Sequence, residues 1–280
     1  MSEIKNLSQL LDAMRKGYRI SKSKARNPQS SHAAPRSTKE KRHFCVSIAG
    51  YAIGVDSMYS EVYMLCKEYL CENEPEIRIS INEDDIAYER RGADLNRHTY
   101  TEGYLETLAV YRKISMAMLD YNIFLMHGAV ISDGQNAYMF TAKSGTGKTT
   151  HIRKWLDQLP NAYVVNGDKP LIRIEDDEII ACGTPWCGKE NMGTNKMAPL
   201  KAIVLMERGD NNEIHEITFG EAFTFLLQQT YQPAGAENMK KTLRLFSQLK
   251  GRVKIYKFAF NNMKEDCFDV AYNALMGDIK

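Results

Sequence analysis

The segment that most constrains the fold covers residues 137–150 and reads AYMFTAKSGTGKTT. Its first five residues are an apolar run that predicts a strand. After a glycine-rich turn, apolar residues at helical spacing predict a helix over 149–159, which stops before Pro160. A strand that passes through such a turn into a helix is a common unit of α/β folds.

The turn has the Walker A spacing, except that Ala142 stands at the first glycine position. Gly145 and Gly147 allow successive N–H groups to converge on phosphate oxygens at the positive end of a helix. Lys148 is expected to reach the β- and γ-phosphates, and Thr149 to offer its hydroxyl to Mg²⁺. The predicted nucleotide-binding residues are Ala142, Lys143, Ser144, Gly145, Thr146, Gly147, Lys148, Thr149 and Thr150.

An acid follows the next predicted strand, 162–165, in the sequence Asn166-Gly167-Asp168-Lys169. Asp168 is placed to hold Mg²⁺, directly or through water, or to take a proton from an attacking hydroxyl. The alternative is a turn aspartate without a catalytic role. Lys169 is either a second phosphate contact or a solvated charge.

Two more segments are expected near this loop. His127 precedes the loop on what should be the neighbouring hairpin strand, and it is either a core residue or a catalytic one. The segment 182–191 contains Trp186, Lys189 and Glu190, which are candidate substrate contacts on an ordered loop. The alternative for this segment is a surface turn with a packing tryptophan.

Elsewhere, predicted strands alternate with predicted helices, which favours a mixed α/β sheet. The expected strands are 44–53 (a strand or hairpin), 76–81, 124–132, 171–174, 178–181, 202–206 and 252–258. The expected helices are 1–18, 57–69, 103–121, 220–229, 237–249 and 264–276.

Charge is unevenly distributed along the 280 residues. Residues 1–43 carry a net charge of +8 and the remainder −6, which together give the overall +2. A basic tail can contact RNA, anionic lipid or acidic protein, but we interpret it as solvated and expect no nucleic-acid partner. The predicted division is a flexible basic segment at 1–43, an α+β region at 44–120 packed on the core, and a nucleotide-binding domain at 121–280.

Targeting signals are not found in the sequence. The most apolar stretch, 114–131, contains Asp120, Asn122 and His127, whereas a membrane helix needs about 20 mostly apolar residues. The N-terminus has no apolar signal region. The six cysteines lack zinc-knuckle spacing and are interpreted as reduced thiols of a cytoplasmic protein.

Sequence motifs also bear on the nucleotide. The His-Arg-Asp and Asp-Phe-Gly motifs of protein kinases are not found. A guanine-specific Asn-Lys-x-Asp motif is also missing, because Thr194-Asn195-Lys196-Met197 lacks the aspartate. ATP with Mg²⁺ is therefore the expected cofactor.

These residues together resemble the catalytic domain of HPr kinase/phosphorylase and its relatives, within the phosphoenolpyruvate carboxykinase-like P-loop proteins. The resemblance rests on His127-Gly128, the glycine-rich loop, Asp168 and Thr184-Pro185-Trp186, and it covers about 124–206. It implies a mixed β-sheet P-loop domain, with a His–Asp pair at the γ-phosphate and Mg²⁺ at the Walker hydroxyl. Here the implied catalytic residues are His127, Asp168 and Lys148, and the implied metal ligands are Thr149 and Asp168.

The sequence departs from this family in two ways. The family commonly has two adjacent acids at the strand end, whereas Asp168 is flanked by Gly167 and Lys169; Glu190 is a candidate replacement. The family's signature for recognition of the protein HPr is missing, so a peptide or small-molecule hydroxyl is the expected acceptor. Relatives assemble into oligomers, which implies a homo-oligomer.

Three functions are compatible with the sequence. The favoured one is a Mg·ATP-dependent kinase that acts on a hydroxyl group. The alternative is a nucleotide-dependent regulatory or binding protein. A carboxykinase-like lyase would need a further metal site built from His127, His151 and Lys189, and His151 is expected to point away.

Overall fold

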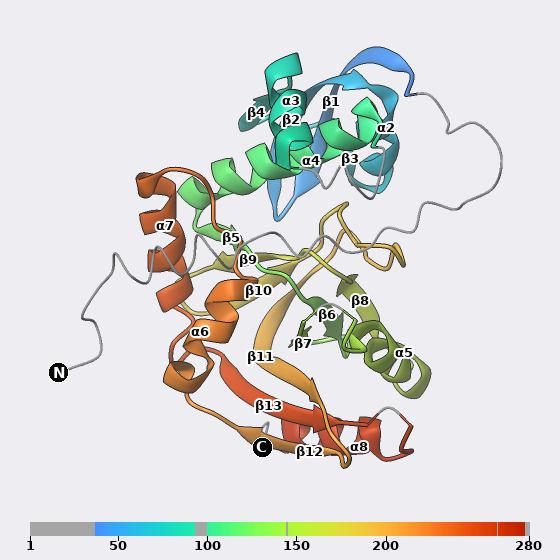
Figure 1. The fold of residues 1–280 in the computed structure, drawn as a ribbon, viewed down its shortest axis with the longest axis vertical. Helices are drawn as coiled ribbons and strands as arrows, with labels where there is room; N and C mark the ends of the chain where they lie inside the picture. The colour runs from blue at the N-terminus through green and yellow to red at the C-terminus, as the bar shows by residue number, and fades with distance from the viewer. Residues whose placement is uncertain (1–36, 93–99, 144, 262, 278–280) are drawn as a thin grey trace.

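The computed structural model describes residues 37–92, 100–143, 145–261 and 263–277. Within these residues the chain forms a small four-stranded sheet and a large nine-stranded sheet, with helices packed on both (Figure 1). The helix predicted over 1–18 lies outside the described residues.

The small sheet has the strand order β3-β1-β2-β4. Its strands are β1 (Lys39–Ile48), β2 (Tyr51–Tyr59), β3 (Leu70–Cys71) and β4 (Ile77–Ser80). β1 and β2 form the hairpin predicted at 44–53, and Ala49 and Gly50 make its turn with φ of 53° and 86°. β1 begins at Lys39, inside the segment expected to be a flexible tail.

Helices cover this sheet between its strands and after them. They are α2 (Ser60–Leu65), the 3₁₀ turn η1 (Lys67–Tyr69), α3 (Glu83–Gly92), α4 (Glu102–Ala117) and η2 (Met118–Tyr121). The helix predicted at 57–69 was too long, because residues 57–59 still belong to β2. α3 was not predicted; its burial pattern explains this, since only Ile86 is buried.

The large sheet consists of two parts that share one long strand. Its strands are β5 (Ile123–Leu125), β6 (Ala129–Ser132), β7 (Ala137–Thr141), β8 (Tyr163–Asn166), β9 (Leu171–Ile174), β10 (Ile179–Cys182), β11 (Met197–Arg208), β12 (Glu213–Glu216) and β13 (Lys254–Phe260). The start of β11 pairs antiparallel with β10, whereas its remainder runs parallel to β7 and β13. The run predicted as one strand at 124–132 is two strands, β5 and β6, with residues 126–128 between them.

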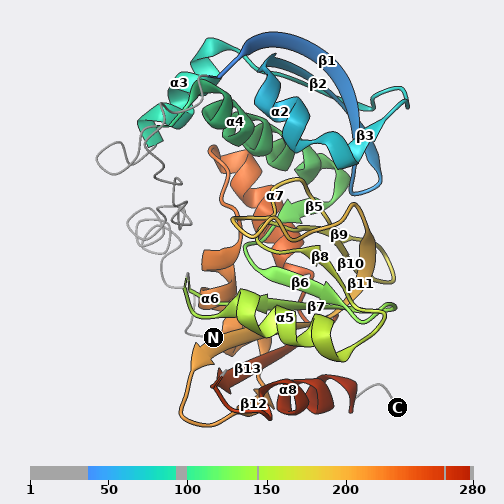
Figure 2. The same cartoon turned by 90° about the vertical axis from the view of Figure 1, so that its right-hand side faces the viewer.

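Side chains alternate between the two faces of the buried strands and contribute to two separate hydrophobic cores. Tyr138 and Phe140 of β7 face one core, and Met139 faces the other. Helices α5 (Lys148–Gln158) and α8 (Cys267–Met276) cover the first core. Helices α6 (Phe219–Gln229) and α7 (Ala236–Ser247) cover the second, on the opposite side of the sheet (Figures 1 and 2).

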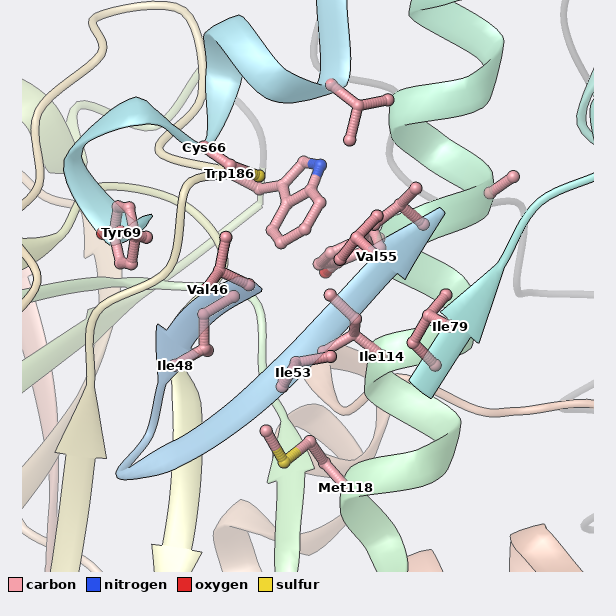
Figure 3. Packing of buried hydrophobic residues seen from close by; sticks show 14 of the residues in the cluster. Val46, Ile48, Ile53, Val55, Cys66, Tyr69, Ile79, Ile114, Met118 and Trp186 are labelled. Atoms are coloured by element: carbon pink, nitrogen blue, oxygen red, sulfur yellow. The ribbon is translucent and has the colours of Figure 1, made fainter. Parts of the chain in front are cut away.

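Trp186 joins the two sheets. It follows β10 in the chain but packs in the core of the small sheet with Ile53, Val55 and Ile114 (Figure 3). Its indole Nε1 donates to the carbonyl of Thr107 in α4 at 3.1 Å. The small sheet is therefore anchored on the large one by a buried aromatic side chain.

The helices in the described part of the chain lack the combined length and apolar character that a membrane crossing needs.

Candidate functional site

Strand direction brings the predicted site together at one edge of the large sheet. β7 and β8 both pair antiparallel with β6, so they are parallel to each other. Their carboxyl ends therefore meet beside the amino end of β6. This places the glycine-rich loop (residues 142–149), Asp168 and His127 at the same edge, as is usual for ligand sites in α/β sheets.

The glycine-rich loop has the strand–loop–helix context that the sequence predicted, since β7 ends at Thr141 and α5 begins at Lys148. Gly145 and Gly147 have φ of 79° and 121°, a region that side chains with a Cβ rarely adopt. The hydroxyl of Thr146 closes the turn by donating to the carbonyl of Lys143 at 2.6 Å. Ala142 is buried at the strand exit and Lys143 is exposed; Ser144 lies outside the described residues.

Lys148 is the cation of this loop. Its Nζ donates to the carbonyl of Ala142 at 3.1 Å. Burial lowers its pKa, and the negative charge of Asp168 opposes that effect. The two side chains are therefore close enough to interact electrostatically across the site.

Asp168 lies between two donors. Its Oδ1 is 3.0 Å from Nε2 of His127, and its Oδ2 accepts from Nζ of Lys169 at 2.7 Å. Burial by itself raises the pKa of this carboxyl, but the His127 hydrogen bond and the Lys169 charge outweigh it and hold the pKa well below its usual range. Asp168 is therefore a carboxylate at neutral pH.

His127 is oriented from its other side by Gln229, the last residue of α6. Nδ1 of His127 lies 3.0 Å from Oε1 of Gln229, and the backbone N–H of His127 donates to the Gln229 carbonyl at 2.7 Å. Thr141, at the end of β7, donates its hydroxyl to the His127 carbonyl at 2.9 Å. The imidazole is thus fixed relative to both Asp168 and the glycine-rich loop.

The backbone around Asp168 is organised by Asn166. Oδ1 of Asn166 accepts from the N–H groups of Asp168 and Lys169 at 2.8 and 2.6 Å, while its Nδ2 donates to both oxygens of Thr184. A Cβ placed on Gly188 would lie 2.9 Å from the Cβ of Asp168. The tryptophan loop (residues 183–196) therefore packs directly against the acid.

A cavity of about 580 Å³ opens where these segments meet. Its lining residues are His127, Ala129, Gly145, Gly147, Lys148, Thr149, Thr150, Ile152, Val164, Gly167, Asp168, Cys187, Gly188, Lys189, Glu190 and Met192. The structure thus brings most of the predicted site residues to one cavity. Oxygen donors of Thr149 and Asp168 in the same cavity suit a hard divalent cation such as Mg²⁺.

The residues expected on the substrate side have different surroundings. Lys189 and Glu190 line the cavity, and Glu190 also accepts from Nη2 of Arg153 in α5 at 2.5 Å. Trp186 does not line it. Its expected substrate contact is therefore corrected to a packing role, because the indole is buried against Tyr111 in the core of the small sheet.

His151 points away from the cavity, as expected. It is fully buried, and its Nε2 accepts from the indole of Trp155 at 3.1 Å. Burial lowers its pKa to about 3, so it is neutral at physiological pH. It belongs to the core on the α5 side of the sheet.

Two residues that contact the site, Gln229 and Arg208, were not predicted from the sequence. Gln229 comes from a helix far along the chain, and no local pattern marks it. Arg208, at the end of β11, donates to the carbonyls of Gly145 and Thr146 at 3.0 and 3.4 Å. The position of Arg208 at the end of a strand parallel to β7 could have indicated this contact. That signal can be used only when the strand order is known.

Comparisons with known proteins give matches among solved structures alone. No protein-family profile and no curated protein match the sequence. Among solved structures, the Hpr(Ser) kinase/phosphatase from Coxiella burnetii matches with a TM-score of 0.35 and 9% sequence identity, over 56% of this chain and 99% of that chain. The neighbour carries the name of the family that the sequence resembles, but so low a TM-score says nothing about the activity of this chain.

Proposed function

We propose that the protein is a Mg·ATP-dependent phosphotransferase that moves the γ-phosphate to a hydroxyl of a peptide or small molecule. The observation that carries this proposal is the cavity in which the glycine-rich loop with Lys148 faces the ionised Asp168. Phosphoryl transfer needs mainly positioning and neutralisation of charge, and these groups supply both.

Each group has a proposed role. Backbone N–H groups of the glycine-rich loop and the ammonium of Lys148 bind the phosphates. Thr149 and Asp168 hold Mg²⁺, which neutralises phosphate charge when it is bound. The acceptor oxygen attacks the γ-phosphorus, the bond from that phosphorus to the β–γ bridging oxygen breaks, and the acceptor proton passes to Asp168 or to the product phosphate.

The low pKa of Asp168 indicates which role this carboxylate has in the transfer. A general base works best with a pKa near the working pH, whereas Asp168 is held well below its usual range. Such a carboxylate favours metal binding and orientation of the acceptor hydroxyl over early proton removal. His127 then serves to orient Asp168 and to stabilise the charge of the transferred group.

The small sheet contributes to the acceptor side in this proposal. Nζ of Lys169 lies 5.7 Å from the ring centroid of Tyr111 in α4. Burial raises the pKa of Tyr104 on the same helix, and the charges of Tyr100 and then of Asp168 add to that effect. Helix α4 therefore lies near Asp168, on the side where we place the acceptor hydroxyl.

The test is acceptor-dependent ADP formation. Purified protein is incubated with Mg·ATP and free serine, serine peptides, sugars, inositol or nucleosides, and products are followed by mass spectrometry. A phosphorylated acceptor that is lost in Lys148→Ala supports the proposal. Tight ATP binding without acceptor-dependent ADP would instead indicate a nucleotide-dependent regulatory protein.

A further inference from the structure

Two cysteines far apart in the sequence lie side by side at the edge of the small sheet. Cys45 of β1 and Cys71 of β3 are directly opposite in the antiparallel register. Their Sγ atoms are 3.1 Å apart. We propose that Cys45 and Cys71 form a reversible intramolecular disulfide, and that this pair exchanges with low-molecular-weight disulfides of the glutathione class.

The backbone is already suited to this bond. Opposed residues of an antiparallel pair have Cα atoms about 4.5–5.5 Å apart, within the usual range for a disulfide. A disulfide has a sulfur–sulfur distance of about 2.05 Å, so the two sulfurs need to approach by only about 1 Å. β3 has two residues and lies at the end of the strand order, so it can absorb that shift.

The other cysteines of the chain have different surroundings. Cys66, Cys182, Cys187 and Cys267 are buried, whereas Cys45 and Cys71 are both partly exposed. Burial raises the pKa of Cys66 and Cys182 to about 12, which suppresses their reactive thiolates. The partly exposed pair of Cys45 and Cys71 is therefore the place where a soluble disulfide can react.

The exchange balances with oxidised glutathione as the oxidant. The Cys71 thiolate attacks one sulfur of oxidised glutathione, the glutathione disulfide breaks, and one reduced glutathione leaves. Cys45 then loses its proton and attacks Sγ of Cys71, which releases the second glutathione. Two protein thiols are oxidised, and their two protons pass to the two glutathione thiolates.

The order of attack follows from the strand order. Cys71 lies on the edge strand β3, whereas β1, which carries Cys45, has a neighbouring strand on each side. We therefore assign the first attack to Cys71. Cys45 acts as the resolving thiol, because the mixed disulfide on Cys71 is held against it.

The proposed disulfide is also connected to the candidate site through Tyr69. Tyr69, two residues before Cys71, donates its hydroxyl to the carbonyl of Thr194 at 3.1 Å. Thr194 belongs to the tryptophan loop, which lines the cavity at residues 187–190 and 192. Oxidation therefore links the segment that carries Tyr69 covalently to β1, and Tyr69 holds the tryptophan loop against the small sheet.

The experiment uses the full-length protein with oxidised glutathione as the probe. Free thiols are blocked with N-ethylmaleimide after unfolding, and intact masses are measured. We expect two of the six thiols to escape alkylation, with no retained glutathione and full reversal by dithiothreitol. Trypsin leaves Cys45 and Cys66 in one peptide, so a protease that cuts after Tyr51, Tyr59 or Tyr63 is needed to assign the link.

Matched variants sharpen the assignment. Cys45→Ser should stop the internal bond and leave one glutathione attached to Cys71, whereas Cys267→Ser should leave the bond unchanged. Six alkylated thiols after oxidation, or a link through Cys66, would overturn the proposal. If a variant does not fold, the peptide map of the wild-type protein decides by itself.

Discussion

Nε2 of His127 lies 3.0 Å from Oδ1 of Asp168, although the whole strand–loop–helix unit of the nucleotide loop separates them in the sequence. This contact exists because β6 runs antiparallel between β7 and β8. It holds a carboxylate in its ionised form opposite Lys148. The proposed chemistry depends on this arrangement.

Lys148→Ala should weaken ATP binding by about 30-fold or more, because removal of one partner of a partly buried charge contact costs about 2–5 kcal/mol. Isothermal titration calorimetry with Mg·ATP measures this loss. Lys154→Ala is the matched control, since Lys154 lies on α5 outside the glycine-rich loop, donates to the carbonyl of Lys264 and does not line the cavity. Equal effects of the two variants would contradict the assigned role of Lys148.

Asp168→Asn should lower the rate of phosphoryl transfer by about 10²–10⁴-fold and keep much of the ATP affinity. The amide keeps the shape of the side chain but removes the negative charge. Measured kcat and the Kd of Mg·ATP separate the two roles. A variant that lost binding but kept kcat at saturating nucleotide would make Asp168 a metal ligand alone.

Asp168 should also make the free energy of unfolding depend on pH. Its pKa is lowered in the folded protein, against about 3.9 in the unfolded chain. The stabilisation is therefore present above about pH 4 and is lost as the pH falls through and below that value. Urea unfolding of the wild type and Asp168→Asn should show a stability difference that is constant near neutral pH and shrinks as the pH falls below about 5. A difference independent of pH would refute the assignment.

Gln229→Leu should lower turnover by about 10-fold and alter its pH profile, because His127 loses the partner that orients its imidazole. A partner that orients a functional histidine through its other ring nitrogen usually accounts for about 10–100-fold in activity. Gln228→Leu is the control, since Gln228 is the exposed neighbour on the same helix. If only the thermal stability changed, Gln229 would have a packing role.

Arg208→Ala should weaken ATP binding by roughly threefold to tenfold, because the glycine-rich loop loses hydrogen bonds worth about 0.5–1.5 kcal/mol. Arg208→Lys should recover little of this affinity, since one ammonium does not reproduce the planar guanidinium that spans two carbonyls. Lys257→Ala, on the neighbouring strand, provides the control. Titration calorimetry is again the measurement, and unchanged affinity in Arg208→Ala would refute the role.

Local patterns predicted most of the secondary structure. The apolar runs of β7, β8, β9 and β10 and the helical spacing of α4 to α8 lie close to their predicted positions. The misses have physical causes. α3 buries too little apolar surface to show periodicity, and β12 is a short, mostly exposed strand paired only with β13 among the described residues.

The sequence by itself determined the strand–loop–helix unit around Gly145, Gly147 and Lys148, because glycine conformations and apolar periodicity are local properties. Only the tertiary structure decided that His127, Asp168 and Gln229 meet, since contacts across a sheet depend on strand order and direction. The tertiary structure also shows that Trp186 packs in the core of the small sheet and that Cys45 lies opposite Cys71. Burial and pairing of this kind arise from packing between distant segments, which a linear pattern does not encode.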